Sequence, residues 1–241
     1  MATIDRKYKA VIFDMGGVLI AGPAALFKTG GQDGGEDKAK KILKLVFSPE
    51  FEQHFAALEC GEKSLEETIP HLAKIYNKEH NDTDNFQNIM DGFKDRALWE
   101  REGAQMNPLW IPVLQKLKDD GLTVVVLTNN FYHDKTKTGK TTSLDEKHFH
   151  AIFESCKLGM RKPDCKIYQH VLDELKVKPE EAIFIDDFEQ NIEGANKLGI
   201  TTIHCKNVED TIKNLEDVLK ISLKEAKIEA KLIEEVEKMK V

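Results

Sequence analysis

The chain has 241 residues, an apolar content of 41% and a net charge of −7, which suit a folded chain with a substantial core. Its acidic balance argues against nucleic acid or an anionic membrane as the main partner. The four cysteines form no CxxC pair, the start lacks a secretion signal, and no apolar stretch approaches the ~20 residues of a membrane helix. These features predict a cytoplasmic protein without a membrane span.

Short apolar runs rich in β-branched residues alternate along the chain with segments of helical periodicity. Runs without polar alternation are typical of strands that are buried on both faces of a sheet. The alternation predicts an α/β fold, a Rossmann-like parallel sheet with helices on both faces. The strongest strand candidates are 10–13, 123–127 and 182–185, the weaker ones are 151–155 and 201–205, and the expected helices are 108–118, 164–175 and 190–198.

The segment 21–105 differs from the rest because it carries helical patterns without strand candidates. One of its helices opens with a capping box, Ser64 to Glu67. We therefore expect a helical cap at 21–105, inserted into a core made of 1–20 and 106–220.

The chain ends with an amphipathic helical pattern at 221–241. Its apolar side either packs on its own domain, which we favour, or serves for docking, including docking in a homodimer. The apolar residues of this side are Ile228, Leu232, Val236 and Met239.

Polar side chains follow the three strongest strand candidates. Because parallel strands end at one edge of a sheet, these groups should lie close together. Carboxylates that meet at one point repel each other unless a cation intervenes, and hard oxygen ligands favour Mg²⁺. The simpler alternative is that each residue caps the following helix. The groups are Asp14, the pair Thr128-Asn129 and the pair Asp186-Asp187, joined by Lys162 in the stretch GMRKPD.

In order and spacing these residues resemble the four motifs of the haloacid dehalogenase-like superfamily, and the helical insert resembles its cap. The stretches VVVLTNN and IFIDDFEQNIEGANKLGITTI are similar to the N-terminal phosphatase domain of soluble epoxide hydrolases. They are also similar to the hydrolase-like domain of an acyl-CoA dehydrogenase family member. The resemblance covers roughly residues 8–220 and implies a hydrolase that acts on phosphoric monoesters.

The resemblance also implies a role for each motif residue. Asp14 would be the nucleophile that forms an aspartyl-phosphate, and Lys162 would neutralise it and the transferred group. Substrate binding would fall to Thr128, Asn129, Gly17 and Lys162, and Mg²⁺ binding to Asp14, Gly16, Asp186 and Asp187. Asn191 either orients the acidic pair or is a plain surface residue.

Gly16 departs from the pattern of family phosphatases, which usually carry a second aspartate at this position. The main-chain carbonyl remains available to a metal ion, but the acid/base side chain is missing. Such a group is worth about 10²–10⁴ in rate, or roughly 3–5 kcal/mol of barrier. Substitutes in the cap could be His54, Glu59 or His71, although each is more simply an ordinary surface or packing residue.

Three interpretations follow from these residues. The first is a Mg²⁺-dependent phosphatase of a small phosphorylated metabolite or lipid phosphate. The second is a weak or inactive relative that binds a phosphorylated ligand or a protein partner. The third is a dehalogenase, which the acidic pair Asp186-Asp187 argues against because dehalogenases need no metal.

Overall fold

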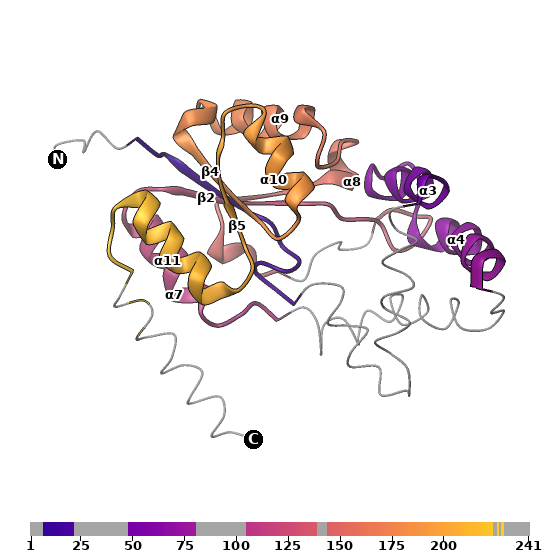
Figure 1. The fold of residues 1–241 in the computed structure, drawn as a ribbon, viewed down its shortest axis with the longest axis horizontal. Helices are drawn as coiled ribbons and strands as arrows, with labels where there is room; N and C mark the ends of the chain where they lie inside the picture. Colours follow the sequence, from indigo (N-terminus) through magenta and orange to yellow (C-terminus); the bar gives the residue numbers. More distant parts are fainter. Residues whose placement is uncertain are drawn as a thin grey trace, which may run out of the picture.

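A five-stranded parallel sheet forms the centre of the protein, with the strand order β3-β2-β1-β4-β5 (Figure 1). The computed structural model describes residues 7–21, 48–80, 105–138 and 144–223, together with 226 and 228. The sheet confirms the predicted α/β class. Its strands are β1 Ala10–Phe13, β2 Thr123–Thr128, β3 Ala151–Glu154, β4 Ala182–Asp186 and β5 Thr201–His204.

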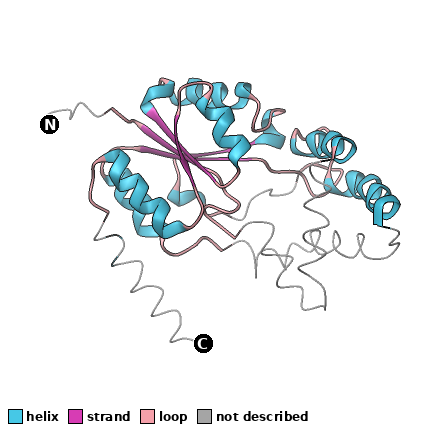
Figure 2. Ribbon diagram, viewed as in Figure 1, coloured by secondary structure: helices cyan, strands magenta, loops and turns pink. Residues whose placement is uncertain are grey.

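Helices cover both faces of the sheet (Figure 2). The helices α7 (Trp110–Asp119) and α11 (Val208–Leu219) lie on one face, and α9 (Cys165–Leu175) and α10 (Glu189–Asn196) lie on the other. Side chains alternate between the two faces along each strand. In β1, Val11 and Phe13 pack into the core under α7 and α11, whereas Ile12 packs into the core under α9 and α10.

Two helices of the expected cap form a hairpin beside the sheet, α3 (Pro49–Glu59) and α4 (Leu65–His80). They share a small apolar core that includes Phe51, Leu58 and Leu72. The predicted capping box is confirmed, because the Ser64 N–H donates to Glu67 Oε2 (2.9 Å) and the Glu67 N–H donates to Ser64 Oγ (3.3 Å). The hairpin is therefore a folded unit with a defined start to its second helix.

Backbone hydrogen bonds tie this hairpin to the loop that follows β2. The N–H groups of Leu65 and Glu66 donate to the carbonyls of Tyr132 and His133, at 2.7 and 3.1 Å. These donors lie in the first turn of α4, where a helix has no internal acceptor for them. The contact between the cap hairpin and the core thus satisfies helix N–H groups on one side and loop carbonyls on the other.

The predicted strands and helices are confirmed with small shifts at their ends. Thr128 and Asp186 are the last residues of their strands, and Ser155 opens a short helix, α8 (Ser155–Leu158), instead of ending β3. Asp164 is the N-cap of α9, and its side chain accepts a hydrogen bond from the Lys166 N–H (2.9 Å). The structure adds α11 and two short 3₁₀ helices, η2 Glu146–His148 and η3 Pro179–Glu181, which the sequence pattern did not predict.

The domain boundaries stay predictions, because 22–47 and 81–104 lie outside the described residues. In the C-terminal segment, Ala226 is buried against the core and Ile228 is 53% exposed, while Leu232, Val236 and Met239 lie outside the described residues. Both readings of this helix therefore remain open. In the part of the chain that the structure describes, none of the helices has the length and apolar character needed to cross a bilayer.

Candidate active site

Strand pairing brings the carboxylates of Asp14 and Asp186 together. Strand β1 pairs with β4 so that Phe13 lies opposite Ile185, and the Asp14 N–H donates to the Ile185 carbonyl at 2.8 Å. Asp14 therefore leaves β1 at the level where Asp186 ends β4. Strands β2 and β3 lie on one side of β1, and β4 and β5 lie on the other, so the strand order reverses between β1 and β4. The carboxyl ends of the strands at such a point are the usual ligand position in parallel sheets.

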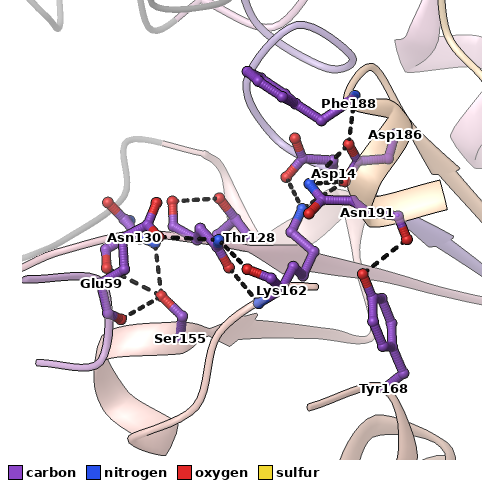
Figure 3. A network of polar contacts seen from close by, with 11 residues as sticks. Asp14, Glu59, Thr128, Asn130, Ser155, Lys162, Tyr168, Asp186, Phe188 and Asn191 are labelled. Atoms are coloured by element: carbon purple, nitrogen blue, oxygen red, sulfur yellow. Dashed lines mark hydrogen bonds and ion pairs between the residues drawn. The ribbon is translucent and has the colours of Figure 1, made fainter. Parts of the chain in front are cut away.

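Lys162 joins these carboxylates from below (Figure 3). Its side chain is 1% exposed, and its Nζ donates to Asp14 Oδ1 at 2.6 Å and to Asp186 Oδ2 at 2.7 Å. Burial by itself lowers the pKa of Lys162, but the attraction of the two carboxylates raises that pKa above its usual range. The site thus holds a protonated ammonium group in direct contact with the expected nucleophile.

Asp186 is held on both carboxylate oxygens. Oδ1 accepts from the Phe188 N–H at 2.8 Å, and the Asn191 amide donates to Oδ1 and Oδ2 at 3.0 and 3.1 Å. Of the two readings of Asn191, the contacts favour an orienting role over a plain surface position. The Tyr168 hydroxyl in turn donates to the Asn191 carbonyl at 2.9 Å.

Asp187 differs from Asp186 because it retains an unused oxygen. Its Oδ1 is buried and, among the described residues, has no hydrogen-bond partner. Burial and the neighbouring Asp186 raise the pKa of Asp187 to about 6. An orphaned acceptor of this kind costs the folded state free energy unless a cation or a proton meets it.

The site carries more negative charge than its lysine can balance. Oxygen atoms of Asp14, Asp186 and Asp187 all lie within 4.8 Å of one another. Burial raises the pKa of Asp14 to about 7, with Lys162 acting in the opposite direction and the other two carboxylates adding to the rise. The donor set and the orphaned Asp187 oxygen fit a divalent cation with oxygen ligands, such as Mg²⁺.

The loop after β1 is shaped around Asp187. Gly17 has a φ of +79°, and a Cβ atom there would lie 2.1 Å from Asp187 Oδ2. A side chain at Gly17 would therefore collide with the acidic pair and strain the backbone. The contact of Gly17 with a phosphoryl group stays a prediction, as does the use of the Gly16 carbonyl.

The two residues of the pair Thr128-Asn129 have different surroundings, one at the strand end and the other against the cap. Thr128 is buried at the end of β2, and its hydroxyl donates to the Asn129 carbonyl at 3.4 Å. The side chain of Asn129 instead bonds the main chain of Lys162 and reaches Glu59 on α3, so both of its N–H groups are engaged inside the protein. The expected contact of the Asn129 side chain with a phosphoryl group is untested, and these bonds would compete with it.

The expected substitutes for the missing acid, His54, Glu59 and His71, all lie on the cap hairpin but have different partners. His54 and His71 stack with ring centroids 5.1 Å apart, one on each helix of the cap hairpin. Glu59 is buried at the end of α3 and forms an ion pair with Arg161. The sequence did not predict the part played by Arg161, for which the only signal was two adjacent cations, Arg161 and Lys162, just before a proline.

Comparison with known proteins gives the family. A profile of the haloacid dehalogenase-like hydrolases matches residues 8–199, which carry all of the site residues described above. The chain belongs to this family.

Individual relatives agree with that assignment. The chain is 29% identical to mouse acyl-CoA dehydrogenase family member 10 over 89% of its own length, and 37% identical to rat bifunctional epoxide hydrolase 2 over 48%. It spans only 19% and 22% of those two larger proteins. A sesquiterpene phosphatase of Aspergillus oryzae is 28% identical over 88% of this chain and 97% of its own.

Solved structures of other proteins share the fold. A family enzyme of Bacteroides thetaiotaomicron in complex with magnesium and inorganic phosphate gives a TM-score of 0.54, with 22% identity, over 83% of this chain and 94% of its own. A dehalogenase with an intermediate complex gives a TM-score of 0.64, with 18% identity, over 90% of this chain and 99% of its own. These structures support the fold only, and the chemistry of this chain depends on its own site.

The charge excess predicts how a variant of Asp14 behaves without metal. The pKa of Asp14 is higher in the folded chain than in the unfolded chain, so its contribution to stability is full below about pH 4 and is lost as the pH rises towards 7. At pH 8 the ionised Asp14 therefore destabilises the folded state, and Asp14→Asn removes this destabilising charge. In the presence of a chelator the variant should have a higher Tm than the wild type at pH 8, with a smaller difference at pH 5.

Thermal unfolding followed by circular dichroism measures this difference. Asp173→Asn on the outer side of α9 is the matched control and should change the Tm little at either pH. A wild type that is more stable than Asp14→Asn at pH 8 in chelator would contradict the charge excess.

Proposed function

We propose that this protein is a Mg²⁺-dependent phosphatase that acts on a small phosphorylated metabolite or lipid phosphate through an aspartyl-phosphate at Asp14. The observation that carries the proposal is the cluster of three carboxylates around one buried lysine, together with an Asp187 oxygen that has no hydrogen-bond partner within the described part of the chain. Mg²⁺ would be held by Asp14, the Gly16 carbonyl and the acidic pair. Within that pair we assign direct contact to Asp187, because the oxygens of Asp186 are already occupied.

The proposed chemistry begins at the free oxygen of Asp14. Among the described residues Lys162 binds Oδ1 only, which leaves Oδ2 to attack phosphorus. The new bond joins Asp14 to phosphorus while the bond to the leaving oxygen breaks. Lys162 stays protonated and holds the nucleophile and the transferred group. Water then cleaves the acyl phosphate and restores the carboxylate. Bound Mg²⁺ would supply charge stabilisation for the phosphoryl group.

Gly16 shapes the proposed substrate preference. With no side-chain acid at this position, the leaving oxygen must depart as an anion or take its proton from water, the substrate or the cap. Acyl phosphates and sugar 1-phosphates have better leaving groups than simple alkyl phosphates and depend less on an acid. We therefore expect the unmodified protein to favour them.

Two observations support a phosphate ester over a haloacid. A dehalogenase needs a carboxylate nucleophile but no metal, which leaves the crowding of Asp186 and Asp187 against Asp14 without a purpose. A phosphatase name is also carried by one relative that matches this chain over most of both lengths. Phe188, which is 42% exposed next to Asp187, adds apolar surface that suits a lipid-like substrate.

The decisive activity test is a panel of phosphate esters with and without Mg²⁺. We expect phosphate release that requires Mg²⁺ and falls by at least about 10³-fold in Asp14→Asn, since the nucleophile is lost. Equal behaviour of the wild type and the variant on every ester would overturn the enzyme proposal. Ligand-induced thermal shifts without turnover would then favour the binding protein, and halide release from a 2-haloacid in chelator would favour the dehalogenase.

Restoring the acid tests the role assigned to Gly16. Gly16→Asp should speed the hydrolysis of alkyl phosphates by about 10²-fold or more, because a proton then reaches the poor leaving group. Hydrolysis of acyl phosphates should gain much less and is the internal control. No gain on alkyl phosphates would mean that the cap or the substrate already supplies the proton.

A further inference from the structure

Glu59 is a buried carboxylate that the proposed chemistry does not use. It is the last residue of the cap helix α3 and is 8% exposed. Its Oε2 accepts from the Asn129 amide at 3.2 Å and lies 2.6 Å from Arg161 Nε, as an ion pair without the alignment of a hydrogen bond. These contacts with Asn129 and with Arg161, the residue before Lys162, suggest that Glu59 has a function.

The Asn129 side chain connects Glu59 to the main chain of Lys162. Its Nδ2 donates to the Lys162 carbonyl at 3.0 Å, and its Oδ1 accepts from the Lys162 N–H at 2.9 Å. Two bonds to the same residue fix both the position and the orientation of that peptide segment. The second N–H of Nδ2 is the one that Glu59 accepts, so Glu59 selects the rotation of the amide that suits Lys162.

A second contact fixes Glu59 itself. Its main-chain carbonyl accepts a hydrogen bond from Ser155 Oγ at 2.6 Å (Figure 3). The same Oγ accepts from the Asn130 N–H at 2.9 Å and lies 3.1 Å from the Asn130 carbonyl oxygen. The end of α3 is thus pinned to the segments after β2 and β3. A movement of the cap helix would be passed to Asn129 and from there to Lys162.

Glu59 contacts Asn129 and Arg161, and among the described residues no hydrogen bond or ion pair joins it to Asp14, Asp186 or Asp187. Figure 3 shows Glu59 on the opposite side of Thr128 and Lys162 from Asp14. Burial raises the pKa of Glu59 to about 7 against the opposing effect of Arg161, so the pKa does not decide between a positioning role and an acid role, and the contacts of Glu59 do. Its role is therefore to act through Asn129 and not as the missing acid.

We propose that Glu59 is a positioning residue through which the cap helix α3, by way of the Asn129 side chain, sets the position of Lys162 against Asp14. The consequence for activity rests on the proposed phosphatase function, whereas the consequence for the Lys162 backbone does not. The chain offers a matched control, because Glu52 on the same helix also pairs with Arg161 (2.5 Å) but is half exposed and bonded to Arg161 rather than to Asn129.

The first test compares Glu59→Ala, Glu59→Gln and Glu52→Ala in the Mg²⁺-dependent assay. We expect Glu59→Ala to lower kcat by about 10- to 100-fold with little change in KM, since a displaced lysine weakens the transition state more than binding. Glu59→Gln keeps an acceptor for Asn129 and should recover most of kcat. Glu52→Ala should match the wild type. A Gln variant as slow as the Ala variant would overturn positioning and indicate proton transfer by Glu59.

The second test reads the Lys162 backbone directly and needs no activity. The Lys162 N–H donates to Asn129 Oδ1. The next residue, Pro163, has no N–H, so mass spectrometry of overlapping peptides can resolve the hydrogen exchange of the Lys162 N–H. Loss of this bond in Glu59→Ala should speed exchange by about tenfold, with no change in Glu52→Ala. Unchanged protection in Glu59→Ala would overturn the inference even if the protein proves to be a phosphatase. Faster exchange in a protein without phosphatase activity would uphold the inference and reject the function.

Discussion

The contact between the Lys162 ammonium group and the carboxylates of Asp14 and Asp186 is the interaction on which the rest of the site depends. It joins segments that are 148 and 24 residues apart in the chain, inside an interior with almost no access to water. An ion pair in such a place is stable only when further partners satisfy it. Asn191 and the Phe188 N–H are these partners for Asp186. The side chain of Asn129 accepts a hydrogen bond from the main-chain N–H of Lys162.

The lysine balances only part of the charge that the fold gathers there. The β1–β4 register brings Asp14 and Asp186 together, and the loop at Gly17 leaves Asp187 close against them. The raised pKa values of Asp14 and Asp187 express this excess. A divalent cation would relieve it, which links the stability of the site to its proposed chemistry. The missing side chain at Gly16 affects a separate step, the transfer of a proton to the leaving group.

Much of the site followed from the sequence because the rule behind it is simple. Parallel strands end at one edge, so Asp14, Thr128 and Asp186 at the ends of apolar runs had to lie near one another. Other features depend on directions that a sequence does not contain. Asp186 and Asp187 differ in the partners that the folded chain brings to each carboxylate, such as Asn191 and the Phe188 N–H for Asp186. The turn of Asn129 towards Lys162, and the burial of Glu59, depend on how the cap hairpin docks. No pattern in the residues of α3 distinguishes the buried Glu59 from the exposed glutamates Glu50 and Glu52 of the same helix.

We expect the excess of carboxylates at this edge of the sheet to bind magnesium. A crystal structure of the protein grown with Mg²⁺ and inorganic phosphate tests this expectation most directly. We expect a cation at about 2.1 Å from oxygens of Asp14, Asp187 and the Gly16 carbonyl, with phosphate against Lys162. A structure in saturating Mg²⁺ with no cation between Asp14 and Asp187 would contradict it.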